Sequence, residues 1–237
     1  MGLLRKSSER TAPSSPRQEE YPPASSPEPQ HPGTPHPFPP SFVVYSISPT
    51  GRHYMLGETE TKPPLYAVSF HAGWTGPDVE LHSGLNETDP PLATAKRGSL
   101  IGGDSATIKL PGPPDDGDHS SGETVKEHVT TSGDDFPYPS YDFTIEVGGQ
   151  REKFEWQHVG MRTGWQLARL STNEAVAHFE WTNLTKKELY FSFVGSGLIG
   201  ALGERWAVMA VITAIRAWDR VRRRQGSGTT AAIVGAH

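Results

Sequence analysis

A glycine motif near the C-terminus is the first pattern in this sequence with recognisable chemistry. Gly195-Ser196-Gly197-Leu198-Ile199-Gly200 matches G-x-G-x-x-G, follows a predicted strand and precedes an apolar segment. In dinucleotide-binding proteins such glycines let a pyrophosphate approach the backbone at a helix N-terminus, and an acidic residue about 20 positions later binds the ribose. Asp219 has that spacing, but it falls late in the predicted helix instead of after a second strand. We therefore expect a flexible loop that leads into the last element, and no bound nucleotide.

The sequence contains few of the motifs that are typical of a metal site or a catalytic site. The ten histidines form no H-x-H or H-E-x-x-H spacing, and no G-x-S-x-G motif occurs. His158 and His178 each fall in a predicted strand and could face each other, although structural histidines are the simpler interpretation. The adjacent Asp134 and Asp135 could bind a cation or could be solvated loop residues. We expect a non-enzymatic protein without metal or cofactor; an enzyme or small-ligand carrier that uses a cavity in the fold is the alternative.

Basic residues cluster in two places that could meet phosphate groups. Lys186 and Lys187 occupy a predicted turn, and four arginines follow the apolar C-terminal segment: Arg220, Arg222, Arg223 and Arg224. Arginine and lysine bind phosphate through charge-assisted hydrogen bonds, so these six residues are the candidate site for the headgroup of an anionic lipid. The alternative is that the arginines cap the negative end of a helix and aid solubility.

Charge and composition limit the other classes of partner. The chain has 237 residues and a net charge of −5, and residues 111–137 carry seven acidic side chains and one basic. Because no strongly basic face is indicated, we expect no nucleic-acid partner. Cysteine is absent and the N-terminus lacks the apolar stretch of a secretory signal, which together favour a cytoplasmic location.

The chain divides into a tail and one domain. Residues 1–40 contain eleven prolines and few apolar side chains, which predicts a disordered tail. From residue 41 the apolar residues recur with a period of two, as in β-strands. Residues 111–123 are predicted as a flexible acidic loop within a domain of residues 41–225, and residues 226–237 as a flexible C-terminal tail. Twelve strands are expected, at residues 41–48, 53–58, 65–70, 78–81, 92–96, 106–110, 124–130, 141–147, 151–159, 165–170, 175–181 and 188–194.

The last element has a different pattern. Residues 206–215 are apolar on nearly all sides, with Thr213 the one weakly polar member, and charged residues flank them. A helix apolar all round lies inside protein or membrane, and a span needs about 20 residues, so a buried helix is expected. Gly226 and Gly228 are expected to end it. Twelve strands must close or split, and a closed barrel of that size needs something to fill its interior. We therefore predict an all-β fold with one helix: a twelve-stranded antiparallel closed β-barrel around a hydrophobic C-terminal helix.

This arrangement resembles the tubby C-terminal-like fold, shared by tubby proteins, LURP-one-related proteins and phospholipid scramblases. Short strings resemble small fungal members of the group, and they are Pro77-Asp78-Val79-Glu80-Leu81, Leu92-Ala93-Thr94-Ala95, Phe154-Glu155-Trp156 and Gly197-Leu198-Ile199. The resemblance covers residues 41–225. It implies a binding module that acts at anionic membrane phospholipids, as a peripheral protein, or as a protein adaptor. No phosphoinositide-binding motif of animal tubby proteins can be matched here, and the absent cysteines speak against lipid scrambling.

Overall fold

The computed structural model describes residues 37–48, 53–72, 76–98, 105–112, 124–132, 139–159, 164–181 and 188–234, with the side chains of Ser132 and of residues 224–234 left out. Within these ranges twelve strands are present, as expected. Their bounds are β1 Ser41–Ser46, β2 His53–Gly57, β3 Tyr66–Phe70, β4 Val79–His82, β5 Pro91–Arg97, β6 Ala106–Leu110, β7 Val125–Ser132, β8 Ser140–Val147, β9 Gln150–Val159, β10 Gly164–Arg169, β11 Glu174–Trp181 and β12 Leu189–Phe193. Two helices follow, α1 (Gly195–Leu198) and α2 (Glu204–Val234).

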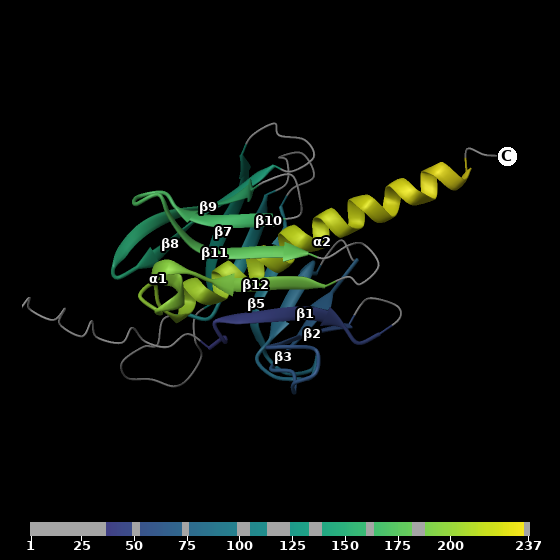
Figure 1. The fold of residues 1–237 in the computed structure, drawn as a ribbon, viewed down its shortest axis with the longest axis horizontal. Coiled ribbons are helices and arrows are strands. Elements are labelled where there is room, and N and C mark those ends of the chain that lie inside the picture. Colours follow the sequence, from purple (N-terminus) through teal and green to yellow (C-terminus); the bar gives the residue numbers. More distant parts are fainter. Residues whose placement is uncertain are drawn as a thin grey trace, which may run out of the picture. The chain divides into compact units, whose positions relative to one another are not determined.

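The strands form a closed antiparallel barrel (Figure 1). Each strand pairs with its neighbours in the sequence, and β1 also pairs with β12, with Ser41 opposite Ser192 and Val44 opposite Leu189. Closure leaves none of these twelve strands with an unpaired edge, which removes the usual route to edge-to-edge aggregation between them. Tight turns join several pairs. Between β8 and β9, Gly148 and Gly149 both have positive φ, as a two-residue hairpin of the primed type requires.

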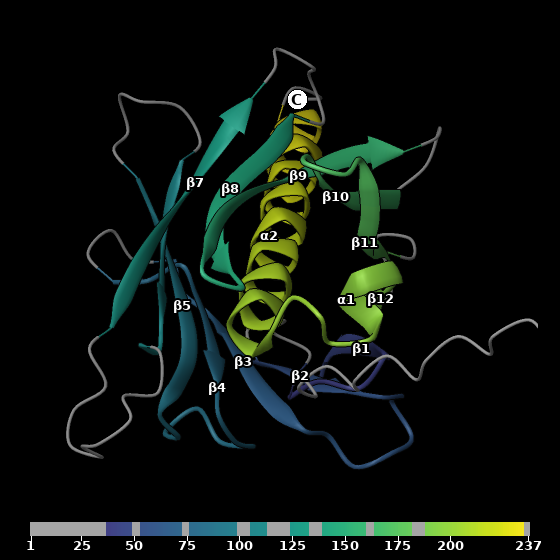
Figure 2. The same ribbon diagram turned by 90° about the vertical axis from the view of Figure 1, so that its left-hand side faces the viewer.

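Helix α2 runs through the barrel (Figure 2). Every residue from Trp206 to Ile215 is buried, whichever direction its side chain takes. The strands contribute the facing layer from alternate positions, such as Tyr141, Phe143 and Ile145 of β8 and Leu189, Phe191 and Phe193 of β12. The apolar run of the sequence is therefore the centre of the core. Among the described residues, no helix has the length and apolar character needed to cross a membrane.

A buried carboxylate fixes the start of α2. Glu127 of β7 accepts hydrogen bonds from both terminal nitrogens of Arg151, each at 3.0 Å, and from Nη2 of Arg205 at 3.0 Å. Glu127 itself is only 3% exposed. A carboxylate in this position needs such partners, because an uncompensated buried charge is strongly destabilising.

The glycine motif forms a tight corner, and the expectation of a flexible loop is wrong. Residues 195–198 make the single turn of α1, and the carboxylate of Glu174 accepts hydrogen bonds from the backbone N–H of Ser196 at 2.6 Å and its hydroxyl at 2.9 Å. A Cβ at Gly197 would lie 2.2 Å from the carbonyl oxygen of Val176 and 2.8 Å from the Trp206 ring. The glycine is needed for close packing here, and the Glu174 carboxylate already takes the Ser196 N–H that a pyrophosphate at this turn would bind.

Both expected ends of the domain need correction. Most of the predicted tail 1–40 lies outside the described residues, but Pro37–Pro40 belong to the barrel. Phe38 is buried against Phe42, Tyr66 and Phe193, and the Tyr66 hydroxyl donates to the Pro37 carbonyl at 2.8 Å. Phe38 is thus part of the core, although the proline-rich segment around it has no periodic apolar pattern that would predict a buried position.

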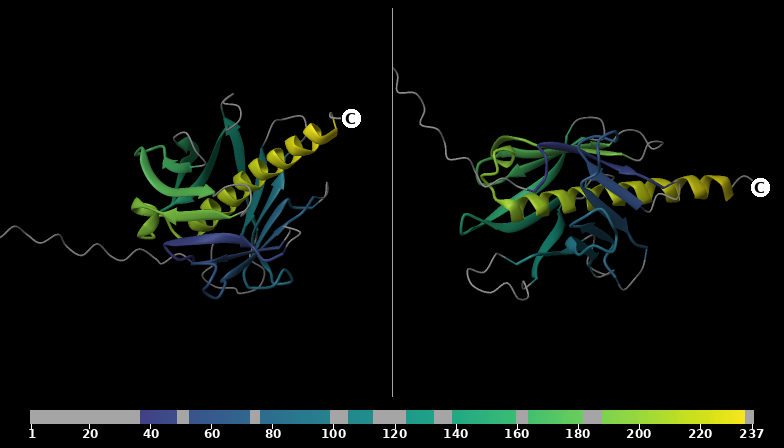
Figure 3. Two further views of the ribbon diagram at one scale, coloured as in Figure 1. Left: turned by 45° about the vertical axis from the view of Figure 1, so that its right-hand side comes forward. Right: turned by 90° about the horizontal axis from the view of Figure 1, so that it is seen from below.

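The C-terminal helix also continues beyond its expected end. It passes Gly226 and Gly228 and reaches Val234, so that α2 extends past the strands at one end of the barrel (Figure 3). A glycine inside a helix costs only about 1 kcal/mol relative to alanine, and no proline follows to interrupt the backbone hydrogen bonds. Nearly all of the acidic segment 111–123 lies outside the described residues.

Candidate functional site

The arginines of α2 from Arg216 to Arg223 lie where the helix leaves the barrel. Arg216 is only 6% exposed, and its Nη2 donates to the carbonyl of Ser105 at 3.2 Å. Burial lowers the pKa of this guanidinium, and the charges of Tyr141, Asp78, Arg97 and Asp219 act on it as well. Arg97, at the end of β5, pairs with Asp78 at 3.2 Å and remains 49% exposed. The end of β5 and the last buried turns of α2 therefore share one rim of the barrel.

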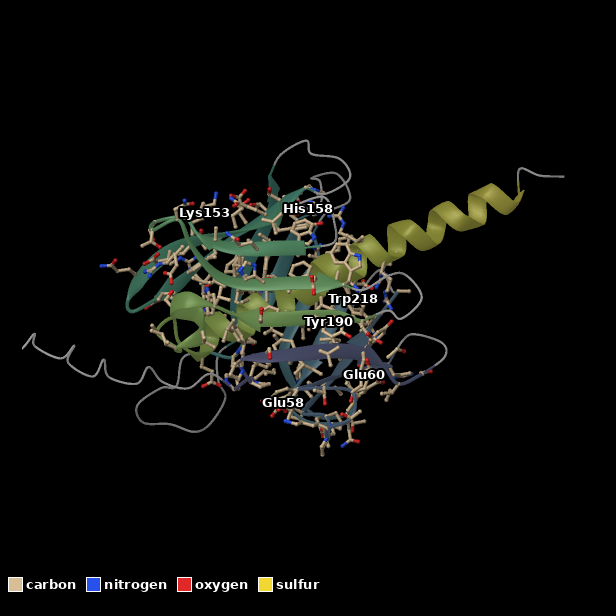
Figure 4. All side chains as sticks on the ribbon, in the orientation of Figure 1. Glu58, Glu60, Lys153, His158, Tyr190 and Trp218 are labelled. Atoms are coloured by element: carbon tan, nitrogen blue, oxygen red, sulfur yellow. The ribbon has the colours of Figure 1, made fainter. Side chains whose placement is uncertain are left out.

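Three aromatic rings hold Arg222 at this rim. Its guanidinium carbon lies 5.0 Å from the ring centre of Tyr54, 4.7 Å from that of Phe70 and 5.4 Å from that of Trp218. Figure 4 shows Trp218 at the point where α2 emerges from the strands. Arg222 also donates to the Tyr54 hydroxyl and, at 2.6 Å, to Asp219. Burial raises the pKa of Tyr54, although the neighbouring guanidinium opposes that shift. Cation–π contacts of this kind gain strength where water is excluded.

Arg223 shares the same carboxylate. Its Nε donates to Asp219 at 2.6 Å and its Nη2 to the carbonyl of His71 at 3.1 Å. The side chain of Asp219 is 6% exposed, that of Arg222 19% and that of Arg223 34%. One buried carboxylate thus serves two arginines, and Arg223 is the one that reaches solvent.

We call this surface the basic rim. It consists of Arg97, Arg216, Arg220, Arg222 and Arg223, with the two carboxylates of Asp78 and Asp219 beneath them. The excess of positive charge makes it suited to an anionic group.

The structure brings together only part of the predicted headgroup site. Arg220, Arg222 and Arg223 lie on the emerging helix, partly buried. Lys186, Lys187 and the side chain of Arg224 are outside the described residues. Trp181 and Glu188 are the described residues on either side of positions 182–187, and they are at the same rim as Tyr54. The strand register gives this placement, because Trp181 is paired with Leu189, Leu189 with Val44, and Ser46 with Tyr54.

Sequence reasoning missed several members of the rim. The spacing of Asp219 from Arg222 and Arg223, three and four residues, is the spacing of ion pairs on a helix and could have indicated them. Trp218 precedes Arg222 by four residues, and this helical spacing could likewise have indicated that the two side chains meet. Tyr54 and Phe70 come from distant strands, and no local signal links them to the helix.

The two strand histidines do not face each other. Strand β10 separates β9 from β11, and Trp165 is paired with His158 while the next residue, Gln166, is paired with His178. Neighbouring residues of a strand point to opposite faces, so the two imidazoles lie on opposite sides of the sheet. Across the described residues, no group of three histidine or acidic side chains could hold a metal ion. Asp134 and Asp135 fall outside that part of the chain.

A serine–histidine pair that the sequence did not indicate lies between β3 and β4. Ser69 Oγ and His82 Nε2 are 2.9 Å apart, and His82 Nδ1 is 3.0 Å from the carbonyl oxygen of Asp89. This is the arrangement of a nucleophile and its base. Ser69 and His82 are 4% and 3% exposed, however, beneath a turn closed by a hydrogen bond from Ser83 N–H to the Pro90 carbonyl at 2.8 Å. The pair therefore fastens that turn to the barrel.

No family model, curated protein or solved structure matches this chain. The case for a function thus depends on the fold and on the chemistry of the described surface.

Proposed function

We propose that the chain is a non-enzymatic binding module of the tubby-like fold that attaches to anionic phospholipids through its basic rim. The single observation that carries the proposal is the gathering of five arginines at the point where the helix leaves the barrel. Arginine presents a planar fork of donors that suits phosphate oxygens. Under this proposal the protein is cytoplasmic and associates with membranes peripherally.

The filled interior supports a surface module over the alternative of a carrier or enzyme with an internal cavity. Three large aromatic side chains are each no more than 2% exposed: Trp156, Trp206 and Phe179. They pack in the same core as the apolar run of α2 that extends to Ile215. A ligand inside the barrel would have to displace the helix on which the fold depends. Contacts at the rim need no such change, which favours binding there.

Two arginines are the best placed to touch a headgroup. Arg97 is 49% exposed and Arg223 34% exposed, whereas Arg222 is held against the aromatic rings. Each basic side chain near an anionic membrane surface contributes about 1 kcal/mol, equal to about fivefold in affinity. Removing the charge of Arg223 should therefore weaken vesicle binding by about that factor, and removing Arg97 by a similar one.

Vesicle sedimentation tests the proposal. The full chain is mixed with vesicles of phosphatidylcholine alone or with added phosphatidylserine, at low and high salt. Binding should require the anionic lipid and should weaken with salt, because the attraction is screened. The variants are Arg223→Gln and Arg97→Gln, and Lys153→Gln is the matched control because Lys153 is 52% exposed on β9, away from the rim.

Equal binding to neutral and anionic vesicles would exclude the basic rim as a lipid site. The same holds if Lys153→Gln weakens binding as much as Arg223→Gln does. Failure to bind either vesicle would leave the protein-adaptor form of the module as the one to pursue.

A further inference from the structure

A second surface, with a charge opposite to that of the basic rim, lies on the outer wall of the barrel. A groove of about 430 Å³ crosses strands β1, β12, β11 and β10, and its lining includes Ser41, Glu58, His178, Glu180 and Tyr190. Figure 4 shows Tyr190 on this wall, and Glu58 directly follows β2, the strand next to β1. The groove is open to solvent and separate from the helix, which occupies the interior.

The strand register explains why this wall is hollow. One row across the sheet runs from Val159 through Gly164 and Glu180 to Tyr190. Gly164 has no side chain, so a gap opens between Val159 and Glu180. The neighbouring row pairs His178 with Ser192, and Ser192 with Ser41, which places two small side chains on the floor. In both rows, residues with large side chains therefore lie beside residues with a small side chain or none, and this difference in size makes the hollow.

The groove and its margin carry negative charge. Glu58 and Glu180 line it, and the Tyr190 hydroxyl donates to Glu188 at 2.8 Å. That hydrogen bond is the main reason that the pKa of Tyr190 rises to about 12, and burial and the charges of Glu188, Glu60 and Glu180 add to the effect. Glu58 pairs with Lys62, whereas within the described ranges no ion pair engages Glu60 or Glu180.

Apolar surface is present beside these carboxylates. Val159 is 39% exposed and Tyr190 38% exposed, both on the groove. A lysine or arginine side chain has an apolar stem and a charged tip, and it prefers a site that offers both kinds of contact. The wall matches that requirement, because Tyr190 is paired with Glu180 and Val159 lies across the Gly164 gap from it in the same row.

We propose that this outer groove is a docking site for a basic peptide segment of a partner protein. The lysine or arginine stems of the peptide lie along Val159 and Tyr190, and their charged ends pair with Glu180. The site does not depend on the basic rim, which has the opposite charge, so the two proposals stand or fall separately.

Binding of fluorescein-labelled octalysine to the full chain, followed by fluorescence anisotropy, tests the proposal, with labelled octaserine as the uncharged control. Two variants probe the groove. Glu180→Gln removes an exposed charge and should weaken octalysine binding about threefold, in the range of an exposed ion pair. Gly164→Leu fills the groove without changing charge and should weaken binding more strongly. A Cβ at Gly164 would meet Val159 at 3.4–3.6 Å, an ordinary contact, so the fold should tolerate it.

Each variant has a matched control. Glu146→Gln removes an exposed outward carboxylate from β8, and Gly76→Leu adds a side chain where nothing lies within 4 Å of the new Cβ. Both should bind octalysine as the parent does. The proposal is overturned if the parent does not prefer octalysine over octaserine, or if a control variant weakens binding as much as its partner. It is also overturned if sedimentation shows a dimer that Gly164→Leu dissociates, since a second copy would then occupy the groove.

Discussion

A hydrogen bond in the centre of the barrel allows a quantitative test of the packing. The indole N–H of Trp156 donates to the hydroxyl of Thr213 at 2.9 Å, and the hydroxyl donates to the Met209 carbonyl at 2.8 Å. Trp156 is fully buried and Thr213 is 3% exposed. Thr213 is the polar exception in the apolar run of α2, and this bond gives the reason: it satisfies an indole N–H that water cannot reach.

Replacing Thr213 by valine removes the acceptor and keeps the shape. Both side chains branch at Cβ and have similar helix propensity, so the helix itself should be little affected. The Met209 carbonyl keeps its place in the backbone ladder of the helix. The buried indole N–H is left without a partner, which costs about 1–3 kcal/mol. For a domain of about 200 residues, 1 kcal/mol shifts Tm by about 2–4 °C, so Thr213→Val should lower Tm by about 6 °C.

A double-mutant cycle separates this term from general packing effects. Trp156→Phe removes the donor, and in that background Thr213→Val leaves nothing unsatisfied. Thermal or urea unfolding, followed by circular dichroism, would be measured for the parent, both single variants and the double variant. We expect a coupling free energy of at least about 1 kcal/mol between the two sites, as for residues in direct contact. If Thr213→Val costs the same in both backgrounds, the hydrogen bond is not what stabilises this part of the core.

Three further predictions concern the helix, the start of the domain and the response to acid. Val211 is fully buried, so Val211→Asp should abolish soluble, folded protein by leaving an unpaired buried charge, measured by soluble yield and circular dichroism; a folded product would contradict the central helix. Deleting residues 1–36 should leave Tm nearly unchanged, whereas deleting 1–40 also removes buried Phe38 and should cost about 3–5 kcal/mol; equal Tm values would contradict the corrected boundary. Hydrogen bonds from Arg169 and Ser171 lower the pKa of Glu152 from 4.5 to about 2. Because the pKa of Glu152 is lower in the folded state, this stabilisation is complete above pH 4.5 and is lost as the pH falls toward 2. Arg169→Met should flatten that part of a Tm-against-pH curve. An unchanged curve would show that Arg169 is not what lowers the pKa of Glu152.

The barrel was predictable because its strands bury one face only. In β8 the residues Tyr141, Phe143 and Ile145 alternate with Asp142 and Thr144, and this period of two is visible without any structure. The helix was predictable for the opposite reason, since an apolar run of ten residues with charged ends fits no half-exposed element. Most predicted strand ends are wrong by only one or two residues, because turns and caps have weaker patterns than burial does.

The candidate site was less predictable because its parts meet only through the barrel. Arg222 lies on the last element, yet two of its three aromatic contacts, Tyr54 and Phe70, come from β2 and β3. The outer groove has the same origin. Gly164 and Ser192 are unremarkable in the sequence, and they make a hollow only because the register places them beside Glu180 and Tyr190.

The position of the helix determines where this protein can interact with other molecules. A barrel of twelve strands is wide enough to hold a ligand, but here α2 and the inward aromatic side chains take that space. Binding through the interior would require the loss of the core, whereas the exposed side chains of the rim and the outer wall can be altered one at a time at smaller cost to stability. Arg223 and Glu180 illustrate this difference: each has a charged group at the surface, and neither belongs to the buried cluster that holds the fold together. Functional contacts should therefore be sought at these two surfaces, where substitutions can separate binding from folding.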